Sequence, residues 1–157
     1  MEFLYKSIDG KQWYYEVFVV DSTLIEHRGI VGDVGCVYER RIPRRCRKQL
    51  VENALLATQA DGYSAMDKEN REVLLVEYAV DGFGTDEDLE KRHALQQRLG
   101  DLLVCRGLGV CDGGSAGAGT MEACCFVIDF LQAKRVIEAD LAETKFADYT
   151  RIYREET

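Results

Sequence analysis

The sequence is poor in the residue types that usually build metal and catalytic sites. It holds two histidines, one tryptophan and one proline, and its six cysteines form no C-x-x-C pair. A structural zinc site draws its ligands from such pairs and from histidines, so this composition gives it little support. No serine, cysteine or threonine stands in a nucleophile motif, and His93 lies among charged residues. We therefore expect a non-catalytic protein that requires no cofactor.

The sequence also lacks signals for membranes and export. No apolar run approaches the roughly 20 residues that a membrane-spanning helix needs. The first ten residues, MEFLYKSIDG, have neither the basic region nor the apolar core of a signal peptide. In the reducing cytoplasm that this predicts, the six cysteines are expected to be free thiols.

Charge is spread unevenly along the 157 residues, whose net charge is −8. Residues 1–70 hold 10 Lys and Arg against 11 Asp and Glu, whereas residues 71–157 hold 10 against 17. The nearly neutral first part contains a dense basic run, and the second part is strongly acidic. The members of that run are Arg40, Arg41, Arg44, Arg45, Arg47 and Lys48.

The first part has the pattern of a small sheet followed by one helix. Aromatic and β-branched residues predict strands over residues 13–20, 23–27 and 36–42. Apolar residues near helical spacing predict a helix over residues 44–60, and Gly62 is placed to end it.

Three evenly spaced glycines occupy the stretch HRGIVGDVG, residues 27–35. With Trp13 at the head of the first strand and Gly62-Tyr63 behind the helix, they fall in the order and at about the spacing of WGR domains. Residues 1–67 therefore resemble the WGR family, whose members are small sheets with one packed helix. The resemblance implies an antiparallel sheet covered by one helix. It also implies a link to nucleic acid, because WGR domains of poly(ADP-ribose) polymerases bind at DNA ends.

The chain departs from the family at its defining motif, W-G-R-I-G. Aligning the glycines sets Arg28 at the position of the family's Trp and Ile30 at that of its Arg. The glycines that shape the backbone are kept, but the side chains that read a DNA end are missing. The stretch is predicted to be a WGR-type hairpin whose recognition chemistry is lost or changed, and a plain hairpin turn stays open as the simpler interpretation.

The basic run could compensate for that loss. Six cations within nine residues could neutralise several phosphates in a salt-dependent, sequence-independent way. Cations at the start of a helix oppose the helix dipole, so an acidic partner is a second interpretation, either a protein surface or the acidic half of this chain. A purely solubilising role is the third. The predicted function is thus a binding or adaptor protein, with Arg28 and the basic run as its candidate binding residues.

The second part, after a polar segment at residues 64–71, alternates strands and helices in the order β-α-β-β-α-β. This is the order of a ferredoxin-like sandwich, so the sequence predicts an α+β protein with a WGR-like module at 1–67 and a ferredoxin-like module at 71–157. The elements are expected at residues 72–80, 86–104 after the cap Thr85, 107–111, 121–129, 131–143 and 149–154.

A glycine-rich segment, residues 113–119, is expected to form a turn between two of these strands. It partly matches the phosphate-binding P-loop, but the lysine is absent and a strand is expected to follow. Asp112 and Glu122 flank the segment and could line a small site. A small-ligand sensor or enzyme using these residues is the alternative function, and a concave pocket there would distinguish it from a binding protein with a flat basic face.

Overall fold

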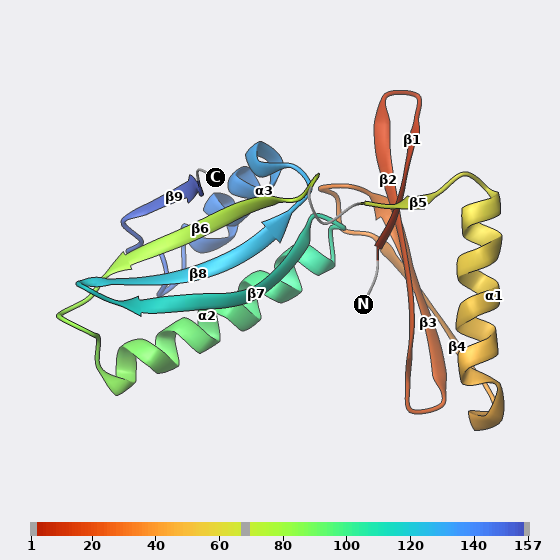
Figure 1. Ribbon diagram of the computed structural model, residues 1–157, viewed down its shortest axis with the longest axis horizontal. Coiled ribbons are helices and arrows are strands. Elements are labelled where there is room, and N and C mark those ends of the chain that lie inside the picture. The colour runs from red at the N-terminus through yellow and green to blue at the C-terminus, as the bar shows by residue number, and fades with distance from the viewer. Residues whose placement is uncertain (1–2, 67–69, 156–157) are drawn as a thin grey trace. The chain divides into compact units, whose positions relative to one another are not determined.

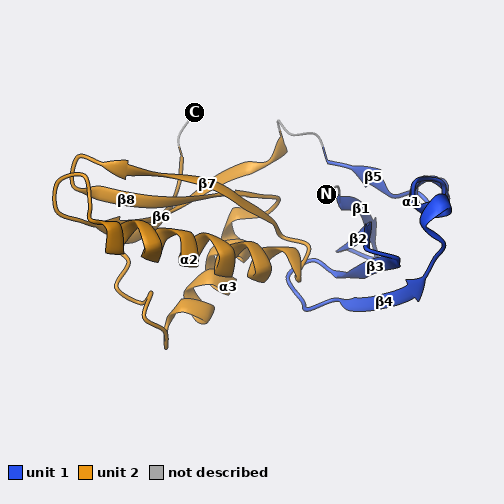
Figure 2. Ribbon diagram, turned by 90° about the horizontal axis from the view of Figure 1, so that it is seen from below, with its two compact units in different colours: residues 1–68 blue, residues 69–157 orange. Residues whose placement is uncertain are grey.

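The computed structural model describes residues 3–66 and 70–155 and has two compact units, Met1–Lys68 and Glu69–Thr157 (Figure 2). The protein is α+β, with a five-stranded antiparallel sheet in the first unit and a four-stranded one in the second. Of the polar segment at residues 64–71, residues 67–69 lie outside the described part of the chain. Among the described residues, no helix is both long enough and apolar enough to cross a membrane.

The sheet of the first unit has the strand order β4-β3-β2-β1-β5 (Figure 1). The outermost strands are thus β4 and β5, each of which pairs with one strand of the sheet only. Strand β5 comes from the polar segment at residues 64–71. The sequence pattern missed β1, which a tight turn at Asp9 and Gly10 joins to β2; both turn residues have positive φ, 51° and 75°. The strands are β1 (Phe3–Ile8), β2 (Lys11–Val20), β3 (Thr23–Ile30), β4 (Cys36–Arg41) and β5 (Ser64–Ala65).

One helix covers one face of this sheet, as expected. The helical segment begins as a short 3₁₀ turn, η1 (Arg44–Cys46), and continues as α1 (Arg47–Ala60), which ends before Gly62 with its φ of 91°. Burial of apolar side chains between helix and sheet stabilises this arrangement. The packed residues are Leu4, Tyr15, Val17, Leu24 and Ile42 with Leu50, Val51, Ala54 and Leu55.

The opposite face of the sheet carries a cluster of rings. The ring of Tyr14 lies 6.0 Å from that of Phe3 and 5.0 Å from that of His27, both edge to face. The loop between β3 and β4 folds over them: a Cβ on Gly35 would lie 2.0 Å from the Tyr14 hydroxyl, and one on Gly29 would lie 2.9 Å from the Gly35 Cα. Close packing therefore requires glycine at two of the three regularly spaced positions. This explains structurally why the stretch HRGIVGDVG contains them.

The second unit interleaves its elements. Its sheet order is β7-β8-β6-β9, and every neighbouring pair is antiparallel (Figure 1). One helix joins β6 to β7, which lie on either side of β8, and another joins β8 to β9, on either side of β6. The elements are β6 (Glu72–Ala79), α2 (Asp86–Val104), β7 (Gly109–Gly117), β8 (Thr120–Val127), α3 (Phe130–Leu141) and β9 (Arg151–Arg154).

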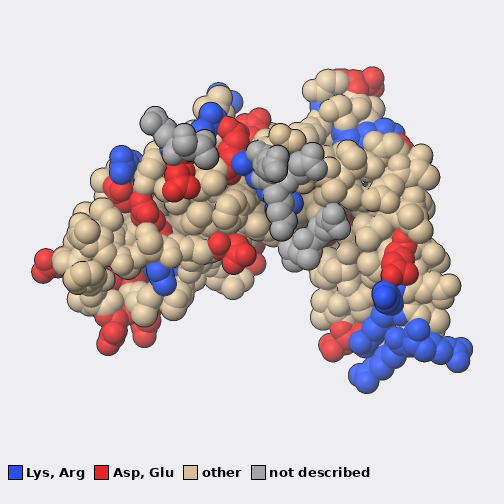
Figure 3. Space-filling model, viewed as in Figure 1, with Lys and Arg blue, Asp and Glu red and all other residues tan. Residues whose placement is uncertain are grey.

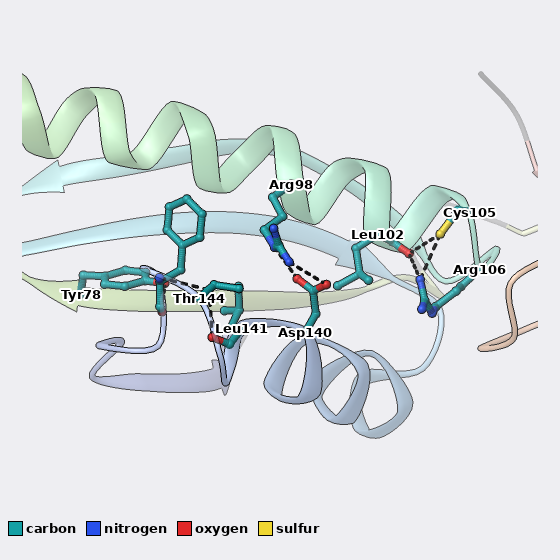
Figure 4. Close-up of polar contacts among 9 residues, drawn as sticks. Tyr78, Arg98, Leu102, Cys105, Arg106, Asp140, Leu141 and Thr144 are labelled. Atoms are coloured by element: carbon teal, nitrogen blue, oxygen red, sulfur yellow. Dashed lines mark hydrogen bonds and ion pairs between the residues drawn. The ribbon is translucent and has the colours of Figure 1, made fainter.

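Both helices cover the same face of this sheet (Figure 2). Alternate residues of β8 from Met121 to Val127 are buried, and their neighbours are half-buried on the other face. Polar contacts join the two helices to each other and the sheet to the segment after α3: Arg98 of α2 donates to Asp140 of α3 at 2.6 and 3.1 Å, and the buried hydroxyl of Tyr78 on β6 donates to a carbonyl after α3 at 2.8 Å (Figure 4).

The glycine-rich segment is not the expected turn. Strand β7 continues through it to Gly117, and only residues 118 and 119 make the turn. The physical reason is close backbone approach: a Cβ on Gly114 would lie 2.3 Å from the Glu122 carbonyl oxygen of β8. A register shift between Cys111 and Gly114 marks a bulge at the start of the segment.

The packing at Gly35 leads to a stability prediction. Gly35→Ala should lower the free energy of unfolding of the first unit by about 2–3 kcal/mol, because its Cβ would meet Tyr14 and His27 at less than van der Waals distance. Denaturant unfolding followed by the fluorescence of Trp13, the only tryptophan, would measure this. The control is Gly100→Ala in α2 of the second unit, whose Cβ would meet nothing closer than 4.0 Å; it should stabilise that unit by about 0.5–1 kcal/mol, followed by the loss of helical circular dichroism. Equal stabilities for the Gly35 variant and the wild type would contradict the packing account.

Candidate functional site

The basic run lies at one end of the first unit, where a strand ends and a helix begins. Figure 3 shows a concentration of basic side chains at this end. The run supplies the last two residues of β4, two residues of η1 and the first two residues of α1. All of them are exposed except Arg47, which is half-buried. We call this group the basic end; it comprises Arg40, Arg41, Arg44, Arg45, Arg47 and Lys48.

A tight corner brings these residues together. Ile42 is buried, and its N–H donates to the Ser22 carbonyl at 2.8 Å, which fixes the end of β4 to the sheet. Pro43, with its φ of −63°, then starts η1, and the N–H of Cys46 donates to the Pro43 carbonyl at 3.0 Å. The single proline therefore turns the chain from strand to helix within three residues, so that cations from both elements share one surface.

The positive charge of the basic end is barely neutralised within the unit. The first turn of α1 has no acidic residue and no side-chain cap, although the amino end of a helix favours negative charge. Among the described residues the basic end makes one ion pair, between Lys48 and Glu52 at 3.8 Å, with both side chains exposed. Such a pair contributes little to stability. The basic end is a surface suited to an external anion.

Arg28, the remaining candidate, lies at the other end of the same hairpin. It is opposite Cys36 at the start of β4, whereas the cations begin at the last two residues of that strand. Four steps along the strand separate Cys36 from Arg40, the first cation of the basic end, which is about 13 Å at 3.3 Å per residue. The Arg28 guanidinium lies over the ring of Tyr38, 4.6 Å from its centroid. Arg28 is thus not a member of the basic end, although its guanidinium lies over Tyr38, two residues before Arg40 on the same face of the sheet.

The alternative site in the second unit is only partly assembled. Glu122 is half-buried on the sheet face away from the helices, where its carboxylate accepts from Tyr153 at 2.5 Å and from Ser115 at 2.9 Å. The bond from Tyr153 raises the pKa of that phenol to about 12. Asp112 is exposed at the bulge and takes no part in these hydrogen bonds. The oxygens of Glu122 are already occupied by hydrogen bonds within the sheet.

Sequence reasoning missed a buried polar group in the first unit. Glu16 of β2 is 0% exposed, and neither of its carboxylate oxygens has a hydrogen-bond partner among the described residues. Nδ1 of His27 lies 3.7 Å from one of these oxygens, too far for a hydrogen bond, while Nε2 of His27 lies 3.0 Å from the Tyr14 hydroxyl. Burial raises the pKa of Glu16 to about 7. The available signal was a single acidic residue inside the apolar run YYEVFVV.

The comparisons with known proteins give no relative: the chain matches no family model, no curated protein and no solved structure. In the part of the chain that the structure describes, no group of three or more His, Cys, Asp or Glu residues is arranged to hold a metal ion. The surface chemistry of the basic end is therefore the main guide to function.

Glu16 gives a prediction for pH dependence. Its pKa is higher in the folded chain, about 7, than its ordinary value of 4.5, so its contribution to stability is complete below about pH 4.5 and is lost as pH rises through 7. Glu16→Gln should therefore leave stability unchanged at pH 4.5 and increase it by about 2–3 kcal/mol at pH 8. Urea unfolding at the two pH values would measure this.

The matched control for this test is Glu39→Gln, which removes an exposed carboxylate from β4. It should change stability by less than about 0.5 kcal/mol at either pH. A Glu16→Gln variant that is destabilised at pH 8 would show that the ionised carboxylate is well compensated, contrary to the burial argument.

Proposed function

We propose that this chain is a non-catalytic binding protein whose first unit, a WGR-like module at residues 1–67, holds the phosphate backbone of nucleic acid at its basic end. The observation that carries the proposal is the grouping of six cations around a helix start that has no acidic residue and no side-chain cap. Within the unit this grouping costs stability through repulsion and the helix dipole. An external polyanion removes that cost.

Phosphate backbone fits this surface better than a single small anion. Arginine binds phosphate oxygens through two parallel N–H donors, and cations on two neighbouring elements can contact several phosphates at once. Each neutralised phosphate releases a bound counterion, so affinity comes largely from charge and falls with salt. The exposure of Arg40, Arg41, Arg44 and Arg45 leaves these guanidinium groups accessible to such a ligand.

Sequence-independent binding is the form that these residues support. Ile30, at the position of the family's Arg, lies opposite Trp13 in the sheet and offers an apolar side chain. The guanidinium of Arg28, at the position of the family's Trp, stacks on the ring of Tyr38. The chain therefore lacks the Trp and Arg side chains with which WGR domains recognise a DNA end. Attraction to phosphates does not depend on those side chains.

For the second unit we propose a ferredoxin-like module at residues 71–157, on the strength of its interleaved strand order. Its role in the proposed adaptor is to present a second, acidic surface. An acidic protein surface, including this half of the same chain, is the competing partner for the basic end, because carboxylates could neutralise the same cations. Duplex DNA binding at low salt distinguishes the two.

The proposal predicts a steep salt dependence. If the basic end neutralises about four phosphates, affinity for a duplex should fall about a hundredfold between 50 and 200 mM salt, with equal affinity for linear and closed circular DNA. Replacing Arg44, Arg45 and Arg47 with Ser should weaken binding and flatten the salt slope by about two to three. Fluorescence anisotropy at several salt concentrations would measure both.

The control removes three exposed cations outside the basic end, Lys11, Arg135 and Lys145, and so makes the same change in net charge. It should bind DNA nearly as the wild type does. No detectable binding at 50 mM salt would reject the nucleic-acid function. Binding that resists salt and requires a DNA end would show instead that Arg28 takes over the role of the family's Trp.

A further inference from the structure

Strand β4 is an open edge of the first sheet. It is the outermost strand, paired with β3 alone, and all six of its residues, Cys36–Arg41, are exposed. Two are large apolar residues: Val37 is 55% exposed and Tyr38 is 49% exposed. In the other unit, by contrast, β7, one of its two outermost strands, contains four glycines and begins with a buried residue, Gly109. Strand β4 is thus the open edge with side chains suited to recognition.

The backbone of β4 has hydrogen-bonding groups to offer. In an antiparallel pair every second residue turns its N–H and C=O away from the partner strand. Among the described residues, the backbone of β4 makes no hydrogen bond to any element but β3. Such an edge is a template for an additional strand, and it extends along the whole exposed length of β4.

The side chains of β4 differ between the two faces of the sheet. On the face that also carries α1, Arg28 of β3 stacks on Tyr38, and Arg40 follows two residues later on the same side. On the other face Val37 is followed by Glu39 and then by Arg41. A strand added beside β4 would therefore meet Arg40 and, over the ring of Tyr38, the guanidinium of Arg28 on one face, and Val37, Glu39 and Arg41 on the other.

We propose that the β4 edge binds an extended acidic segment of another protein, which joins the sheet as a sixth strand. Charge selects this occupant: acidic residues on alternate positions would lie beside Arg40 and beside Tyr38, whose ring carries the Arg28 guanidinium, and an apolar residue between them would pack near Val37. A second copy of this chain is disfavoured, because it would bring the same positively charged edge against itself. The proposal shares Arg40 and Arg41 with the basic end, but it depends in addition on backbone pairing along β4, which nucleic-acid binding does not need.

The test uses synthetic peptides of about ten residues in three forms that separate charge from strand pairing. The first alternates Glu and Val, the second alternates Lys and Val, and the third is the Glu-Val peptide methylated at every backbone nitrogen. The third keeps the side chains and the charge but has no N–H donors. Each would carry a fluorophore and be titrated with the full chain at 150 mM salt.

We expect the Glu-Val peptide to bind at least about tenfold more tightly than either of the others, a difference of 1.4 kcal/mol. Amide hydrogen exchange should slow in Cys36–Arg41 when it binds. Replacing Arg40 and Arg41 with Ser should weaken the peptide about tenfold, whereas the matched pair Arg44→Ser with Arg45→Ser should change it less than about threefold. These two pairs remove equal charge from neighbouring positions.

Three outcomes would overturn the proposal: no binding of the Glu-Val peptide, equal binding of the methylated peptide, or protection of β4 amides by self-association without peptide, measured by sedimentation. The test is separate from that of the proposed function. Loss of DNA binding in the Arg44 and Arg45 variant with peptide binding intact would confirm that the two surfaces differ. Failure of the chain to bind DNA would leave the peptide result unaffected.

Discussion

Close packing of the β3–β4 loop against Tyr14 and His27 is the constraint on which the features of the first unit depend. Gly29 and Gly35 have no side chains, and this lets the loop lie directly on the two rings. The loop fixes the start of β4, and the buried Ile42 fixes its end. Between these two points β4 is held as an exposed strand, and beyond the second the chain turns at Pro43 into η1 and α1, which carry the remaining cations.

The unit retains two electrostatic costs that a fold selected for stability alone would avoid. One is the basic end, where like charges gather at a helix start without an acidic residue. The other is Glu16, a buried carboxylate without a hydrogen-bond partner among the described residues. Unfavourable groups of this kind concentrate at functional sites. The basic end is exposed and can be neutralised by an external ligand, and this separates it from Glu16, which has no access to solvent.

Several local features could be predicted because short-range chemistry decides them. Helix α2 begins where the cap Thr85 and Asp88 exchange hydrogen bonds between side chain and backbone, at 2.8 and 3.2 Å. The strand expected at residues 121–129 is present as β8, Thr120–Val127, in which alternate residues are buried. The segment at 113–119 was wrongly interpreted as a turn, because glycine permits turns locally but here serves a close approach to a strand that only pairing reveals.

The sequence by itself determined the element types, the α+β class and the grouping of charge, because periodicity, caps and composition act over a few residues. Only the tertiary structure decided which charged groups share a surface. It joined the strand and helix cations at one corner, and it placed the backbone of Arg28 on the neighbouring strand, opposite Cys36 and so about 13 Å along the sheet from the first cation, Arg40. It also buried Glu16 beside His27, which lies eleven positions further along the chain and directly opposite it in the sheet. Strand register and packing set these distances, and they depend on contacts between residues far apart in the sequence.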